Sequence, residues 1–170
     1  THANSFSDAL KVASREDPDI ILVGEMRDLE TISLALTCAE LGILVFGTLH
    51  TNSAAKTIDR IISAFPSNMQ AQTRTMLAES VKAIIAQQLL KTADGKGRCA
   101  SNEILIGTKA LASMIREGKV SQISSLLQTG SNLGMQSMEQ HILQLIDEGK
   151  ITREEAASKG IKLFENPADL

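Results

Sequence analysis

The sequence predicts an α/β fold in which a small parallel sheet is followed by a helical region. Two short aliphatic runs, at residues 20–23 and 43–46, have the length and the β-branched content of strands that are buried on both faces. A helical pattern follows each run, so strand and helix alternate twice within about fifty residues. Such alternation is typical of a right-handed parallel α/β unit.

The two helices of this alternating part have recognisable start and stop signals. Asp28 is positioned to cap the first helix, whose apolar residues include Ile32 and Leu36. Gly42 is positioned to end that helix. Ser53 is positioned to cap the second one.

A third helix and a hairpin are predicted next. Ser67 and Gln70 have the spacing of a capping box, and apolar residues continue at helical spacing as far as Ile85. Residues 93–97, Ala-Asp-Gly-Lys-Gly, predict a hairpin-type turn, and residues 99–106 predict a returning strand.

The rest of the chain is predicted to be helical. Helices are expected over residues 109–117, 120–128 and 135–148, with a glycine just beyond each of them. A last short helix is expected to start at Thr152, with Glu155 completing a capping box.

Composition excludes several classes of function. The 170 residues have a net charge of -3, no Trp, no Tyr and only four Phe, which argues against a nucleic-acid-binding surface. Cys38 and Cys99 are too few for a four-thiolate zinc site, and the three histidines lack metal-ligand spacing, so no metal site is predicted. One of these histidines, His141, is expected at the surface of a helix. The longest apolar run, residues 41–49, is too short to span a bilayer, so no membrane insertion is expected.

Polar residues follow both predicted strands directly. Residues 24–28 come after the first strand and residues 47–51 after the second. Because ligands of parallel α/β sheets bind at the carboxyl ends of the strands, these two segments predict a functional site.

Glu25 and His50 are the candidate catalytic residues of this site. A carboxylate at the position of Glu25 can orient a water or act through a metal ion. The alternative is a strand-end glutamate in a surface ion pair with Arg27. An imidazole at His50 can donate a hydrogen bond to a phosphate or relay its presence to a neighbouring subunit. The alternative is a histidine that bonds a backbone carbonyl.

The phosphate-binding loop of nucleotide hydrolases is absent from the sequence, so no cofactor-binding residue can be assigned. That loop requires Gly, four residues, Gly, Lys and then Ser or Thr. The chain has three Gly-Lys pairs, but the position that would hold the first glycine is occupied in each case by another residue: Leu90, Ser113 or Gln144.

Two segments closely resemble the secretion-ATPase superfamily, the hexameric RecA-like motors of type IV pili and type II secretion. Residues 15–32 resemble its Walker B region and residues 47–60 resemble its His box. Residues 112–120 resemble the C-terminal motif of its pilus-retraction branch. The assembly and type II secretion members typically have a paired CxxC element here, and this chain has none.

The resemblance implies roles for four residues. Glu25 would be the catalytic glutamate of the Walker B motif, polarising the attacking water and helping to hold magnesium. His50 would lie near the γ-phosphate and couple its loss to subunit motion. Arg116 and Glu117 would belong to the retraction motif, outside the hydrolysis site. Gly24 stands where many nucleotide hydrolases have a metal-binding Asp, so the resemblance leaves direct magnesium ligation from this strand in doubt.

The resemblance also implies an organisation and a setting. Residues 1–107 would be the C-terminal part of a RecA-like core, and residues 108–170 a helical C-terminal subdomain. The Walker A loop would precede Thr1 in a longer protein that uses ATP and Mg²⁺, and this chain alone would be inactive.

That protein would be a homo-oligomer, expected to be a hexamer. It would lie in the cytoplasm at the bacterial inner membrane, with the pilus platform protein as partner. Two alternatives stay open: a non-catalytic interaction module of the pilus machinery, and an assembly or type II secretion ATPase of the same superfamily.

Overall fold

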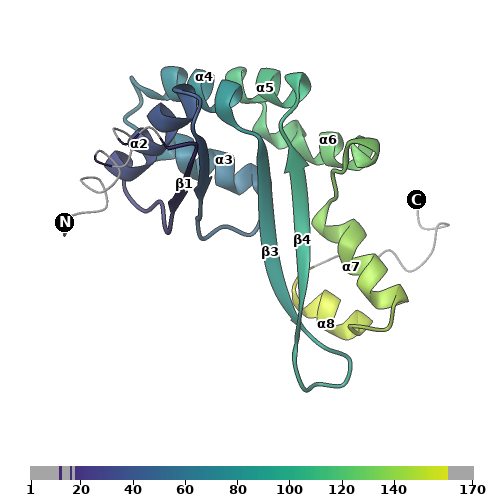
Figure 1. The fold of residues 1–170 in the computed structure, drawn as a ribbon. Coiled ribbons are helices and arrows are strands. Elements are labelled where there is room, and N and C mark those ends of the chain that lie inside the picture. Colours follow the sequence, from purple (N-terminus) through teal and green to yellow (C-terminus); the bar gives the residue numbers. More distant parts are fainter. Residues whose placement is uncertain (1–11, 13–15, 17, 161–170) are drawn as a thin grey trace. The chain divides into compact units, whose positions relative to one another are not determined.

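A computed structural model describes residue 12, residue 16 and residues 18–160 (Figure 1). Those residues form two compact units that interleave along the chain. One unit takes in residues up to 51 together with 55–82 and 107–123, and the other takes in 52–54, 83–106 and the residues from 124 onward. The domain boundary predicted between residues 107 and 108 does not coincide with a boundary between these two units. The division into domains at that point stays a prediction.

The first unit contains the predicted parallel pair. Strand β1 (Ile20–Val23) runs parallel to β2 (Leu44–Gly47), with Ile20 opposite Leu44 and Val23 opposite Gly47. Helix α2 (Leu29–Glu40) connects them and ends before Gly42, whose φ of 93° suits glycine. Asp28 caps α2 as predicted, since its carboxylate accepts a hydrogen bond from the backbone N–H of Thr31 at 2.8 Å.

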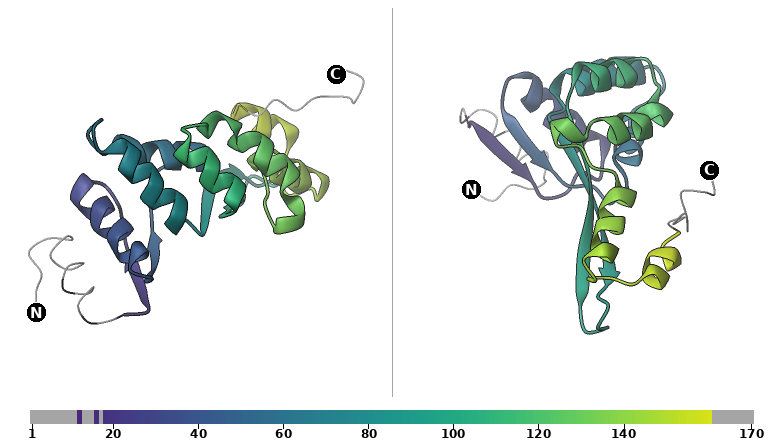
Figure 2. Two further views of the ribbon diagram at one scale, coloured as in Figure 1. Left: turned by 90° about the horizontal axis from the view of Figure 1, so that it is seen from above. Right: turned by 90° about the vertical axis from the view of Figure 1, so that its right-hand side faces the viewer.

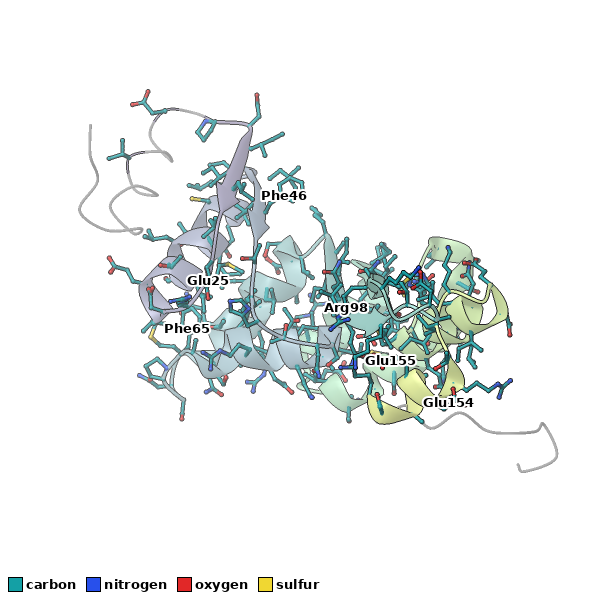
Figure 3. The ribbon with its side chains drawn as sticks, turned by 90° about the horizontal axis from the view of Figure 1, so that it is seen from below. Glu25, Phe46, Phe65, Arg98, Glu154 and Glu155 are labelled. Carbon is teal, nitrogen blue, oxygen red and sulfur yellow. The ribbon has the colours of Figure 1, made fainter. Side chains whose placement is uncertain are left out.

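The strands of this pair are buried on one face only, which corrects the expectation of two buried faces. Ile21 and Val23 pack with Cys38 of α2 in a small core. The opposite face is exposed, and within the described chain this sheet has two strands. The exposed apolar residues on that face are Ile20, Leu22, Leu44 and Phe46, of which Phe46 is labelled in Figure 3.

Three helices complete the first unit. Helix α3 (Ala54–Ser63) buries Ile58, Ile61 and Ile62. Helix α4 (Gln70–Ser80) packs against both α2 and α5 (Lys109–Arg116).

The capping box predicted at the start of α4 is wrong. The residue before the helix is Met69, which makes no side-chain cap, and the Gln70 amide instead donates to the carbonyl of Phe65 at 3.0 Å.

Helix α4 is also shorter than predicted. It ends at Ser80, because Val81 takes an extended conformation and residues 83–91 form a strand. Gly107 closes this junction: its N–H donates to the Lys82 carbonyl at 2.7 Å, and a side chain there would overlap the carbonyls of Val81 and Lys82. Ile84 and Ile85, at the end of the predicted helical stripe, therefore lie on a strand, where Ile84 is buried and Ile85 is 66% exposed.

The second unit is built on a long antiparallel hairpin. Strand β3 (Ala83–Lys91) pairs along its whole length with β4 (Arg98–Ile106), and the right-hand view of Figure 2 follows this ribbon. The predicted returning strand is thus present. One face of the hairpin is buried, with Leu90 and Leu105 fully covered.

Short helices follow the hairpin, with boundaries that differ slightly from the predictions. They are the 3₁₀ turns Val120–Gln122 and Ser131–Leu133 and the helices α6 (Ile123–Thr129), α7 (Met138–Asp147) and α8 (Arg153–Ser158).

The starts of α7 and α8 correct two predictions. Helix α7 starts later than predicted, because Ser137 caps it in a capping box with Gln140. Thr152 caps α8 as expected, but the carboxylate of Glu155 accepts a hydrogen bond from the Lys91 backbone N–H at 2.8 Å.

No helix among the described residues is long and apolar enough to cross a membrane.

Candidate functional site

The two predicted catalytic side chains meet just beyond the ends of the parallel strands. Glu25 lies two residues after the end of β1, and His50 lies three residues after the end of β2. The Glu25 Oε1 atom is 3.0 Å from His50 Nε2. The parallel pairing of the strands thus brings together residues that are 25 positions apart in the sequence.

Arg27 is the third member of this cluster. Its Nε atom is 2.5 Å from the same Glu25 oxygen. The Glu25 side chain, labelled in Figure 3, is 24% exposed, whereas those of Arg27 and His50 are 76% and 86% exposed. The carboxylate is therefore partly sheltered, while both of its partners remain open to solvent.

The electrostatics of the cluster favour the ionised form of Glu25. The hydrogen bond from Arg27 is the largest cause and lowers the pKa of Glu25. Burial opposes it, and the charge of Arg27 and the contact with His50 add smaller effects in the lowering direction. The same pair raises the pKa of Arg27. A carboxylate held in its charged form can accept a proton from water or orient it.

The sequence left two interpretations of Glu25 open, a catalytic residue near His50 and a surface ion pair with Arg27. The structure shows a contact of each kind, because Glu25 pairs with both residues. For His50 the observed partner is a carboxylate and not a backbone carbonyl. The imidazole of His50 thus lies beside Glu25, the candidate base of the site. A group that responds to the reacting phosphate is expected at this position.

Backbone contacts join the two strand-end segments. The Met26 N–H donates to the Thr48 carbonyl at 2.9 Å, and the Thr48 hydroxyl donates to the Gly24 carbonyl. Farther along, the hydroxyls of Thr51 and Thr57 are 2.7 Å apart. Thr48 was not singled out by the sequence, because a hydroxyl that bonds a carbonyl 24 residues away has no local signature.

Arg116 and Glu117 lie at the end of α5, and among the described residues they make no hydrogen bond or ion pair with Glu25 or His50. Glu117 accepts a hydrogen bond from the Ser113 hydroxyl at 2.8 Å and pairs with Lys119 at 2.6 Å. Lys119 and Ser113, in that order, lower the pKa of Glu117. These residues therefore form a local cluster of their own.

Two further polar residues were missed or misjudged from the sequence. His141, expected on the surface, is half-buried, and its Nδ1 accepts a hydrogen bond from the Asn102 backbone N–H at 2.9 Å. Glu103 of β4 is buried and accepts a hydrogen bond from the Ala54 backbone N–H at 2.7 Å. Both side chains accept a hydrogen bond from a backbone N–H group, so the contacts that they make have a structural role.

Among the described residues no group of three or more His, Cys, Asp or Glu side chains could hold a metal ion. Glu25 is the carboxylate of the site, and both of its ionic contacts fall on one oxygen. A single carboxylate fits a magnesium ion held mainly by substrate phosphates and water, and it does not make a site for a metal held by the protein alone.

Comparison with known proteins identifies the family. The model of the family described as "Type II/IV secretion system protein" matches residues 1–160. The chain belongs to this family. This result confirms the resemblance to secretion ATPases that residues 15–32 and 47–60 predicted.

Two relatives are similar over nearly the whole chain. A twitching motility protein of Neisseria gonorrhoeae is 58% identical over 91% of this chain and 41% of its own length. A type IV pilus retraction ATPase, PilT, of Pseudomonas aeruginosa is 57% identical over 95% of this chain and 46% of its own length. The chain thus spans less than half the length of these relatives.

A solved structure supports the fold. The crystal structure of the pilus retraction motor PilT with bound ADP matches 99% of this chain and 46% of that chain, with a TM-score of 0.83 and 46% identity. The predicted fold class, an α/β part of a RecA-like core followed by helices, is confirmed by this match.

Proposed function

We propose that this chain provides the water-activating carboxylate of an ATP-hydrolysing motor that powers type IV pilus retraction. The observation on which the proposal depends is the 3.0 Å contact between Glu25 and His50 at the carboxyl ends of two parallel strands. The family membership and the similarity to retraction ATPases support the substrate and the biological role.

In this proposal Glu25 acts on the water that attacks the γ-phosphate. Its charged carboxylate accepts a hydrogen bond from that water and turns a lone pair of the water oxygen toward phosphorus. The hydrogen bond from Arg27 lowers the pKa of this carboxyl below its ordinary value, which favours the charged form further. Phosphoryl transfer depends mostly on positioning and charge stabilisation, so one correctly placed carboxylate is a substantial contribution.

His50 would report the presence of the γ-phosphate. Its exposed imidazole contacts Glu25 through Nε2, and when both ring nitrogens are protonated its Nδ1–H can donate a hydrogen bond to a phosphate oxygen. Loss of the phosphate would free the ring to move, and that motion could pass to a neighbouring subunit.

The remaining parts of the machinery would come from outside this chain. The phosphate loop that binds ATP is not in the sequence. Mg²⁺ would be held by the nucleotide phosphates and water, with Glu25 as a protein carboxylate near it. The 170-residue chain alone is therefore expected to show no measurable hydrolysis.

The proposal extends to assembly and location. The complete protein would be a homo-oligomer, a hexamer, in the cytoplasm at the bacterial inner membrane, with the pilus platform protein as its partner. Arg116 and Glu117, at the end of α5, would act in retraction and not in hydrolysis. Residues 1–107 and 108–170 would correspond to the end of the RecA-like core and to the C-terminal subdomain.

A non-catalytic interaction module is the second candidate, because the chain lacks a phosphate loop. An assembly or type II secretion ATPase is favoured less, since the similarity to retraction proteins extends over 91–95% of the chain at 57–58% identity.

The test is ATP hydrolysis by the complete protein that contains this chain, with Glu25→Gln. This change keeps the size of the side chain and removes its charge. We expect kcat to fall by about 100-fold or more, while binding of a fluorescent ATP analogue stays near that of the unaltered protein.

The matched control is Glu40→Gln, the same change at an exposed position at the end of α2. It is expected to leave kcat unchanged. Hydrolysis by Glu25→Gln at the rate of the Glu40→Gln control would refute the proposed role, and absence of nucleotide binding by the complete protein would favour the interaction module.

A further inference from the structure

Thr48 contacts the backbone on both sides of Glu25. Its hydroxyl donates to the carbonyl of Gly24, and its own carbonyl accepts from the N–H of Met26 at 2.9 Å. The Gly24 carbonyl belongs to the peptide group that precedes Glu25, and the Met26 N–H belongs to the peptide group that follows it. One residue thus restrains both peptide planes that set the direction of the Glu25 side chain.

A side-chain contact reinforces this cross-link. The thioether of Met26 lies over Gly47: a Cβ atom at position 47 would be 2.6 Å from Met26 Cε and 2.7 Å from its sulfur. Glycine at position 47 therefore lets the two segments approach closely, directly before Thr48.

We propose that Thr48 is a positioning residue that holds the Glu25 carboxylate within reach of His50. The inference rests on the proposed role of Glu25. It assigns to the Thr48 hydroxyl a task that its backbone cannot perform, because only the hydroxyl reaches the Gly24 carbonyl. Serine can perform that task, and valine, which has nearly the same shape, cannot.

The Thr48 hydroxyl is expected to affect the position of the Glu25 carboxylate more than the free energy of folding. Thr48 and Gly24 are both exposed, so water can replace the bond between them at little net cost in the free energy of folding. Without the bond, the peptide before Glu25 can rotate, and the carboxylate is no longer fixed against Arg27 and His50. Displacements of about 1 Å at a reacting group can cost about 100-fold in rate.

The experiment is a titration of the Glu25 side-chain carboxyl by ¹³C NMR in the 170-residue chain. The titratable groups that contact this carboxyl are Arg27 and His50, and both lower the pKa of Glu25. We expect Thr48→Val to raise the pKa of Glu25 toward its ordinary value and Thr48→Ser to leave it as in the unaltered chain. His50→Ala is expected to raise the pKa in the unaltered background and to have no further effect beside Thr48→Val.

A Thr48→Val chain with an unchanged pKa of Glu25 and a full effect of His50→Ala would overturn the inference. If Thr48→Val does not fold, Thr48→Ala serves in its place. In the unaltered chain, the amide hydrogen of Met26 should exchange slowly with solvent, and exchange at the rate of an open loop would also overturn the inference.

A kinetic measurement separates this inference from the proposed function. In the complete protein, Thr48→Val should lower kcat for ATP about tenfold with little change in KM, and Thr48→Ser should restore it. The titration involves no hydrolysis, so it tests Thr48 even where Glu25→Gln retains activity and the proposed function fails.

Discussion

The two strand pairs of this chain differ in how their surfaces are covered within their own units. The short pair β1–β2 packs one face on α2 and leaves the aliphatic and aromatic residues of the other face exposed, including Leu22 at 74% and Phe46 at 53%. The long pair β3–β4 has one buried face, on which Leu90 and Leu105 are fully buried.

The outer edge of β4 is also paired, at residues 102–104. Ile104 exchanges two backbone hydrogen bonds with Gln136, at 2.8 and 3.0 Å. The Gln136 amide donates to the Asn102 carbonyl at 2.8 Å, and His141 accepts from the Asn102 N–H.

The comparison separates chemistry from support. The pair β1–β2, which has few buried contacts, is followed by the loops that hold Glu25 and His50, and hydrogen bonds between these two loops fix their positions. The pair β3–β4 forms part of a buried core, and backbone groups along its edge are hydrogen-bonded. Functional groups are commonly found where few buried contacts constrain the backbone, because such groups must remain accessible to substrate.

The largest effect on stability is expected from the core of the hairpin. Leu90 is fully buried among Ile142, Leu145 and Ile151. Leu90→Ala should lower the free energy of unfolding by about 2–5 kcal/mol, because it removes buried methyl groups and leaves a cavity. Urea unfolding followed by circular dichroism measures this loss.

The neighbouring residue gives a matched control. Leu89 is 53% exposed on the opposite face of the same strand, and Leu89→Ala should change the free energy of unfolding by less than about 0.5 kcal/mol. Equal losses for the two variants would contradict the assignment of one buried and one open face to this hairpin.

A smaller effect on stability is expected at the N-caps of two helices, one in each unit, which should respond differently to acid. Asp28 caps α2 through its carboxylate, whereas Ser137 caps α7 with a hydroxyl. The backbone and side-chain hydrogen bonds from Thr31 lower the pKa of Asp28 below its ordinary 3.8. Because the folded pKa is the lower one, this contribution to stability is present above the ordinary value and is lost as the pH falls through the folded pKa.

The measurement is hydrogen-exchange protection of two amides across this acidic range. Thr31 N–H bonds the Asp28 carboxylate and Gln140 N–H bonds the Ser137 hydroxyl. Protection of Thr31 should decrease with acid, while that of Gln140 is maintained, and Asp28→Asn should abolish the acid response. A parallel decrease at both amides, also in Asp28→Asn, would instead indicate general unfolding.

The sequence was sufficient for features whose signals are local. Asp28 before an apolar stripe predicted a cap, and Gly42 predicted a helix end, because each requirement involves only neighbouring residues. The meeting of Glu25 and His50 was predictable for a different reason: parallel strands bring their carboxyl ends to one edge of the sheet.

Features that depend on distant partners were not predictable. Ile84 and Ile85 fit a helical stripe, and their pairing with residues 104–105 makes them part of a strand instead. Nothing near His141 in the sequence indicates that it accepts a hydrogen bond from the backbone N–H of Asn102. Thr48 likewise has no local signal, because the peptide that its hydroxyl contacts lies in another loop.

The most direct test of the central claim, that the contact between Glu25 and His50 is needed for hydrolysis, is a double-mutant cycle on ATP hydrolysis by the complete protein. The variants are Glu25→Gln, His50→Ala and the two changes together. Residues that act as a unit are non-additive, so we predict that kcat of the double variant lies within about twofold of kcat for Glu25→Gln alone. A double variant in which the two losses multiply would mean that the residues act independently, which contradicts the claim.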